Sequence, residues 1–186
     1  MDDVDIVIVN MNSLTDIQID QAARILSGEL PLGWPTVTDA LCEIEDRWNE
    51  EDATFIAALA GGEVTGWCGV ISRYGGHVFE LHPLAVRRDW QRKGVGSKLM
   101  REAESIAASK GGLTMWIGAD DEKPGGETSF ANADLYDDLP KRIREFKPGS
   151  HQTAFYMKLG YKIVGVLPDA NGAGKPDIFL AKRLTK

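Results

Sequence analysis

Hydrophobic residues recur along the chain with two different spacings, and the spacing separates strands from helices. Short β-branched or alternating runs are typical of strands, whereas apolar residues three or four positions apart form one face of a helix. The first kind of pattern predicts strands at residues 5–10, 54–60, 65–72, 78–86, 113–118, 162–167 and 177–184. The second predicts a helix capped by Thr15 and broken at Gly33, and further helices at residues 36–49, 94–110, 134–143 and 152–159.

This order of elements predicts an α/β (α+β) fold. Three successive strands separated by Gly-Gly turns form an antiparallel meander, and the later strands alternate with helices. We therefore expect a mixed, mostly antiparallel central sheet of about seven strands with helices on both faces. No repeat and no Pro/Gly/Ser-rich linker divides the chain, so residues 1–186 are expected to form a single domain.

Composition narrows the range of partners. The formal net charge is -7 and the sequence pI is about 5.0, so non-specific binding to nucleic acid or to an anionic membrane is disfavoured. Clustered acidic residues would instead favour a cationic partner. Two cysteines, Cys42 and Cys68, give no metal-binding CxxC spacing, and no metal is expected. No signal peptide and no apolar run of about 20 residues is present, which predicts a cytoplasmic protein.

The segment from Gln91 to Ser97 (QRKGVGS) lies between a predicted strand and a predicted helix. Glycines let a ligand approach the backbone, and the first amides of a helix point outward with the positive end of its dipole. This arrangement is typical of phosphate binding, although the glycines alone could equally mark a tight turn. A Walker A loop does not fit the frame, and a Rossmann fingerprint fails because Leu99 occupies its last glycine position.

The loop resembles the pyrophosphate loop of the GNAT superfamily, Q/R-x-x-G-x-G/A, and the strand order is also that of GNAT proteins. The resemblance implies the GNAT fold and acetyl-coenzyme A (acetyl-CoA) as cosubstrate. The residues that it assigns to acetyl-CoA binding are Leu84, Val86, Gln91, Arg92, Lys93, Gly94, Val95, Gly96 and Ser97.

A closer resemblance is to the aminoglycoside 6′-N-acetyltransferases of the enterococcal chromosomal type. It rests on residues 80–84 (ELHPL), 118–121 (GADD), Asp134-Leu135-Tyr136 and 155–182, above all GVLPDANG at residues 165–172. The match spans roughly residues 66–183, whereas in the first 52 residues only Trp34-Pro35 is similar. This resemblance implies direct acetyl transfer to the 6′-amino group of aminoglycosides in a ternary complex, antibiotic resistance, and a homodimer.

Candidate catalytic residues lie on the strand before the loop. Glu80 and His82 are two residues apart and therefore share a face, where either could accept a proton from an ammonium group. The alternative is a hydrogen-bonded histidine and a solvated glutamate. Pro83 lacks an N–H and should interrupt the strand ladder. By resemblance, the Leu84 N–H stabilises the thioester carbonyl, and Tyr156 donates a proton to the departing thiolate unless it is a packing aromatic.

Acidic residues crowd the segment that follows the strand at residues 113–118. Such a run is usually a solvated loop, but carboxylates are natural ligands of a polyammonium acceptor. We therefore predict Trp34, Glu80, Asp120, Asp121 and Asp137 as acceptor contacts. His77 and His151 are predicted to be surface residues.

Two alternative functions stay open at this stage. One keeps the enzyme and changes the acceptor to a protein lysine or N-terminus, a polyamine or another small amine. The other is a non-catalytic acyl-CoA sensor, which would keep the glycines of the loop but needs no proton-handling groups. The presence of Glu80, His82 and Tyr156 disfavours the sensor.

Overall fold

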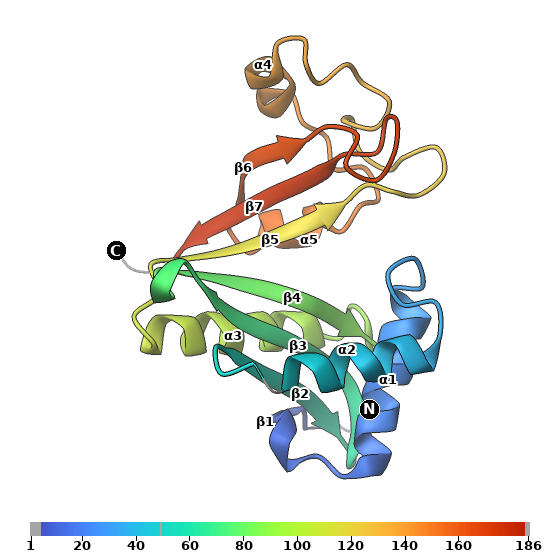
Figure 1. Cartoon of the computed structure of the whole chain (residues 1–186), viewed down its shortest axis with the longest axis vertical. Coiled ribbons are helices and arrows are strands. Elements are labelled where there is room, and N and C mark those ends of the chain that lie inside the picture. Colours follow the sequence, from blue (N-terminus) through green and yellow to red (C-terminus); the bar gives the residue numbers. More distant parts are fainter. Residues whose placement is uncertain (1–4, 49, 185–186) are drawn as a thin grey trace. The chain divides into compact units, whose positions relative to one another are not determined.

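The computed structural model describes residues 5–48 and 50–184, which form two compact units (Figure 1). The first unit comprises the described chain up to Met115 together with residue 184, and the second runs from Trp116 to Arg183. The strands follow the order β1-β2-β3-β4-β5-β7-β6, which confirms the expected seven-stranded sheet. The expectation of one domain stays a prediction.

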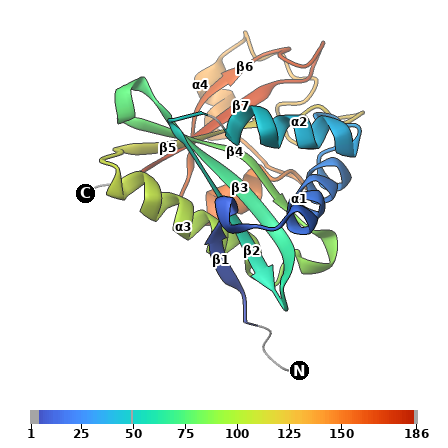
Figure 2. The same cartoon turned by 60° about the horizontal axis from the view of Figure 1, so that its bottom comes forward.

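The first unit is built on an antiparallel meander. Its strands, each paired with the next, are β1 (Val7–Asn10), β2 (Ala53–Ala60), β3 (Glu63–Arg73) and β4 (Val78–Val86). Its helices are α1 (Asp16–Glu29), α2 (Val37–Trp48) and α3 (Val95–Ser109). Helices α1 and α2 lie on one face of these strands and α3 on the other (Figure 2). The predicted end of the second helix at Asn49 lies outside the described residues.

Helix α1 begins where the sequence predicts. The Thr15 side chain accepts a hydrogen bond from the Gln18 amide, and the Gln18 side chain accepts one from the Thr15 amide, which forms a capping box. The buried face of α1 packs against β3, where the Trp67 indole donates to the Ala22 carbonyl at 2.9 Å. This bond satisfies the polar atom of a fully buried aromatic side chain and fixes α1 on the sheet.

The β3–β4 ladder is interrupted at Pro83, as predicted. Cys68 pairs with Leu84 and Val70 pairs with Leu81, so Gly69 alone faces both His82 and Pro83. A Cβ at Gly69 would collide with the His82 carbonyl oxygen, and a glycine is therefore required there. The irregularity lies in the stretch of β4 that carries the candidate catalytic residues.

The second unit contains most of β5 (Thr114–Asp120), two short helices and a hairpin. The other elements are α4 (Leu139–Arg144), α5 (Thr153–Lys158), β6 (Lys162–Leu167) and β7 (Asp177–Arg183). Strands β6 and β7 are antiparallel to each other. No helix in residues 5–48 or 50–184 is long and apolar enough to cross a membrane.

Two predictions about the second unit are wrong. The helix expected from residue 134 begins only at Leu139, because Asp138 has a left-handed backbone (φ 48°) and caps the Lys141 amide with its side chain. His151 is buried rather than on the surface, since its Nε2 lies 3.0 Å from the Asp120 carbonyl oxygen and its Nδ1 3.3 Å from the Thr153 hydroxyl. His77 is exposed, as expected.

Candidate functional site

The loop between β4 and α3 is turned back on itself by unusual backbone angles. Arg92 has φ 61° and Gly94, the residue before α3, has φ 87°. The left-handed angle at Gly94 favours glycine even though space for a Cβ exists there. The Gln91 side chain donates to the Val86 carbonyl at 2.9 Å and to the Glu29 carboxylate at 2.9 Å. Gln91 therefore ties the loop both to the end of β4 and to the end of α1.

The first turn of α3 points its amides toward this loop. The first bond of the helical ladder runs from Lys98 to Gly94 at 3.0 Å, so the amides of Val95, Gly96 and Ser97 precede that ladder and have no partner within the helix. Arg92 and Lys93 are exposed beside them. Outward-facing amides at the positive end of a 15-residue helix, with two cations nearby, form an arrangement that can hold a pyrophosphate.

The even-numbered residues of β4 share its half-buried face. Burial alternates strictly along the strand, so Glu80, His82, Leu84 and Val86 are half-buried while the residues between them are buried. The pairing of Glu80 and His82 on one face therefore agrees with the alternation predicted from the sequence. Leu84 follows directly after the interrupted part of the ladder and pairs with Cys68.

His82 lies between an aromatic ring and a carboxylate. Its ring centroid is 5.7 Å from that of Trp34, and its Nε2 is 3.6 Å from Oε1 of Glu43. Trp34 also packs against the core cluster of the first unit, so its position is fixed. The structure thus places two residues predicted for the site, Trp34 and His82, in contact.

Glu43 and Arg47, one turn apart on α2, complete the surroundings of His82 and were not predicted. Their side chains form a salt bridge, and Nη1 of Arg47 also lies 3.4 Å from Oε1 of Glu50. The neighbouring His82 ring, together with Arg47, lowers the pKa of Glu43 from 4.5 to about 2, although burial acts in the opposite direction. Glu43 is thus ionised at neutral pH and presents a fixed negative charge to His82.

Glu80 forms an ion pair with a different partner. Its carboxylate accepts a hydrogen bond from Nε of Arg73 at 2.8 Å. Burial would lower the pKa of the Arg47 guanidinium, but nearby carboxylates raise it. Among these carboxylates Glu43 has the largest effect and Glu80 the smallest. The two candidate bases therefore differ, because Glu80 is paired with a cation while His82 faces an anion.

The remaining predicted acceptor contacts belong to the second unit. Asp120 is exposed and accepts a hydrogen bond from Asn171 at 2.6 Å. Asp137 is also exposed. Asp121 is fully buried, and its two oxygens accept the amides of Glu127 and Thr128 at 2.7 and 2.8 Å. Burial would raise the pKa of Asp121, but these hydrogen bonds lower it. The same hydrogen bonds hold the loop that follows β5 in place.

Tyr156, the predicted proton donor, is buried on α5. Its ring packs edge-on against Phe155 and Tyr161, with centroids 5.2 and 6.1 Å away. This packing orients the ring. In residues 5–48 and 50–184, no group of three or more His, Cys, Asp or Glu side chains is placed to hold a metal ion.

The sequence was compared with protein families and with curated protein sequences. The sequence profile of the Acetyltransferase (GNAT) family matches residues 19–124. No curated protein sequence matches the chain.

Solved structures are similar over almost the whole length. One is an aminoglycoside 6′-N-acetyltransferase in complex with coenzyme A, 34% identical, covering 97% of this chain and 98% of that chain with a TM-score of 0.87. Another is the aminoglycoside 6′-N-acetyltransferase of Enterococcus faecium, 35% identical, with the same coverage and a TM-score of 0.85. A third, an aminoglycoside 6′-acetyltransferase type Ii, is 30% identical, with the same coverage and a TM-score of 0.74.

Proposed function

Because this chain belongs to the GNAT family of acetyltransferases, which use acetyl-CoA, we propose that it acetylates the 6′-amino group of aminoglycosides and so confers resistance to them. The observation that carries the proposal is the similarity, at 34–35% identity over 97% of the chain, to two enzymes named for that reaction. A cytoplasmic location and a homodimer belong to the same proposal.

In this proposal the loop before α3 binds acetyl-CoA, and strand β4 supplies a hydrogen-bond donor to its thioester. The amides of residues 92–97 hold the pyrophosphate of acetyl-CoA, which supplies an acetyl thioester. The Leu84 N–H donates to the thioester oxygen, where negative charge builds during attack. One such donor contributes roughly 3 kcal/mol to the transition state.

Proton transfer is assigned from the partners of each side chain. The amine must lose a proton before its nitrogen forms the new bond to the acetyl carbon, and His82, whose Nε2 lies 3.6 Å from Oε1 of Glu43, takes that proton. Glu80 and Trp34 of the first unit position the cationic acceptor, and Asp120 and Asp137 stay acceptor contacts predicted from the sequence. As the carbon–sulfur bond breaks, the acetylated nitrogen loses its second proton. The thiolate takes a proton from the Tyr156 hydroxyl, and the proton that the nitrogen releases restores that hydroxyl.

Regiochemistry tests the proposed acceptor. Aminoglycosides with a free 6′-amine should be paired with analogues carrying a 6′-hydroxyl, with spermidine and a lysine peptide included. We expect thiol release only with the 6′-amino compounds, and NMR should place the acetyl group on that nitrogen. Equal rates for the 6′-hydroxyl analogues, or reaction of the peptide alone, would show that the acceptor is a different amine.

A further inference from the structure

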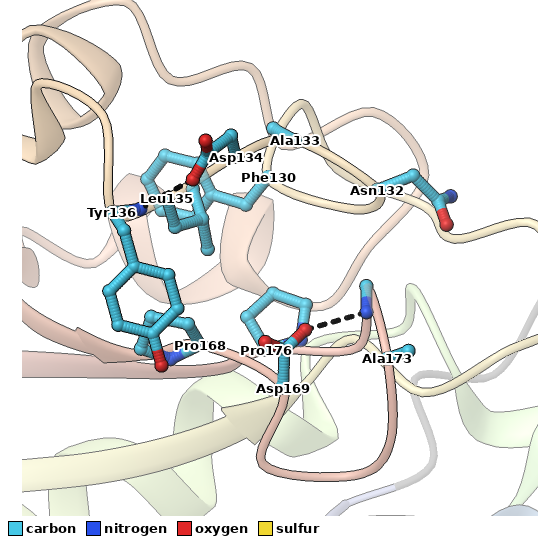
Figure 3. A pocket seen from close by; sticks show the side chains of 11 residues that line it. Phe130, Asn132, Ala133, Asp134, Leu135, Tyr136, Pro168, Asp169, Ala173 and Pro176 are labelled. Carbon is cyan, nitrogen blue, oxygen red and sulfur yellow. Dashed lines mark hydrogen bonds between the residues drawn. The ribbon is translucent and has the colours of Figure 1, made fainter.

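The second unit contains a cavity of about 420 Å³ that the proposed reaction leaves unused (Figure 3). Its apolar wall includes Phe130, Leu135 and Pro176, all buried, and the ring of Tyr136, which is 79% exposed. The volume lies within the range of small-molecule sites, and the apolar wall can pack against the carbon skeleton of such a molecule.

Two segments that are distant in sequence form this cavity. One runs from residue 130 to 136 and the other from 168 to 176. They are joined by a hydrogen bond from the Asn132 amide to the Gly174 carbonyl at 3.0 Å. Gly174 has φ 72°, and a Cβ there would lie 2.6 Å from the Asn132 side chain, so the close approach depends on glycine.

The same two segments carry part of the resemblance to the aminoglycoside enzymes. Asp134-Leu135-Tyr136 lies in the first segment, and the end of the GVLPDANG stretch lies in the second. Neither stretch contributes to the phosphate loop or to β4. Both stretches contribute residues to the wall of this one cavity.

The charged residues that line the cavity are of one sign. They are Asp134 and Asp169, both exposed, and among the residues that the structure describes no basic side chain lines the cavity. One oxygen of each carboxylate is held by a backbone amide, that of Tyr136 at 3.0 Å and that of Gly174 at 2.7 Å. These bonds fix the carboxylates, and in the described residues no protein donor is recorded for their second oxygens. Each carboxylate can therefore accept a further hydrogen bond from a cationic donor.

We propose that this cavity binds a ring that carries protonated amino groups, with Asp134 and Asp169 accepting from the ammonium groups and Tyr136 covering the ring. The cationic character of the ligand is argued from the two aspartates of the cavity, whereas the choice of an aminocyclitol ring rests on the proposed function. An ammonium group near the Tyr136 ring also gains a cation–π contribution.

Calorimetry on the full chain tests this with 2-deoxystreptamine as a one-ring diamine and spermidine as a linear polyamine. We expect 2-deoxystreptamine to bind, and Asp134→Asn and Asp169→Asn each to weaken it about tenfold. Asparagine keeps the oxygen that holds the backbone amide, so the turns should survive. Tyr136→Ala should also weaken binding, while Tyr136→Phe keeps the ring and should bind like the parent.

Glu145→Gln is the matched control, because it removes one exposed negative charge from the same unit outside the cavity. Acetyl-CoA affinity should be unchanged in every variant. Equal weakening in Glu145→Gln, or spermidine binding with the same affinity and the same response to the variants, would overturn the proposal. If aminoglycosides are acetylated but the cavity variants bind 2-deoxystreptamine like the parent, this inference fails alone. If binding responds as expected but no aminoglycoside is acetylated, the proposed function fails and the site stands.

Discussion

His82 and Glu80 share one face of β4, yet their neighbours give them different electrostatic surroundings. His82 faces the Glu43 carboxylate at 3.6 Å, and Glu80 is bonded to Arg73 at 2.8 Å. We expect His82→Ala to lower kcat/KM for the amine by about 100-fold and to remove or shift the acidic limb of the pH–rate profile, because a general base is lost. Initial rates of thiol release, measured over a range of pH values, give both kcat/KM and the pH–rate profile.

Glu80→Ala should also lower kcat/KM for the amine while leaving acetyl-CoA affinity nearly intact. Asp46→Asn, an exposed charge removed from α2, serves as the control and should behave like the parent. If both single variants and the double variant keep the parental profile, solvent takes the proton and the pair is structural.

We predict that the free energy of unfolding depends on pH through Asp177. Burial, together with the charge of Asp120, raises its pKa from 3.8 to about 6, although amide hydrogen bonds from Ala119 and Ile178 oppose the shift. Ionisation is thus less favourable in the folded state, so this group's contribution to the free energy of unfolding falls as pH rises from about 4 to 6. We expect Asp177→Asn to raise the free energy of unfolding by about 1 kcal/mol at pH 7.5, after allowance for solvent screening, and to change it little at pH 4. Urea unfolding at both pH values tests this, and an equal effect at both would contradict it.

The contact between Glu43 and His82 could not be predicted from the sequence. The pairing joins residues 39 positions apart on different elements, and no local pattern reports such a contact. The Glu43–Arg47 pair at i, i+4 was visible as helical spacing, but that spacing is also typical of a solvated helix face. Glu80 and His82 could be predicted to share a face because alternation along a strand is local.

At the scale of elements, the loop at residues 91–94 was predictable as a turn before a helix, because its glycines and its place in the sequence are local features. Its role in binding pyrophosphate stays a prediction. We expect Gly96→Asp to weaken acetyl-CoA binding at least about 100-fold, since it sets a carboxylate against the pyrophosphate and obstructs approach to the backbone. Ser105→Asp puts the same charge on an exposed position of α3 away from its first turn and should bind like the parent. Calorimetry that gives one affinity for Gly96→Asp and the parent would remove the loop from the acetyl-CoA site.

Elements with a strong period were predicted to within a few residues, and the errors lie where turn chemistry overrides period. Strand β4 has its predicted bounds, and α3 differs from prediction by one residue at each end. The start of α4 was wrong because Asp134 and Asp138 hydrogen-bond the backbone locally. His151 was misplaced because its partners lie on β5 and α5, so tertiary contacts decide its burial.

At the scale of the whole molecule, the predicted homodimer needs a surface to form through. Strand β6 ends the sheet order on one side, with Val164 and Leu167 exposed by 64% and 53%. An open strand edge with exposed apolar side chains favours pairing with another chain. We therefore expect a dimer in light scattering at micromolar concentration, and the double variant Val164→Lys/Leu167→Lys to be a folded monomer. Val7→Lys, at the half-exposed edge strand β1 that ends the order on the other side, is the matched control and should stay dimeric. Dissociation by Val7→Lys instead would assign the interface to β1, and a monomeric parent would refute the dimer itself.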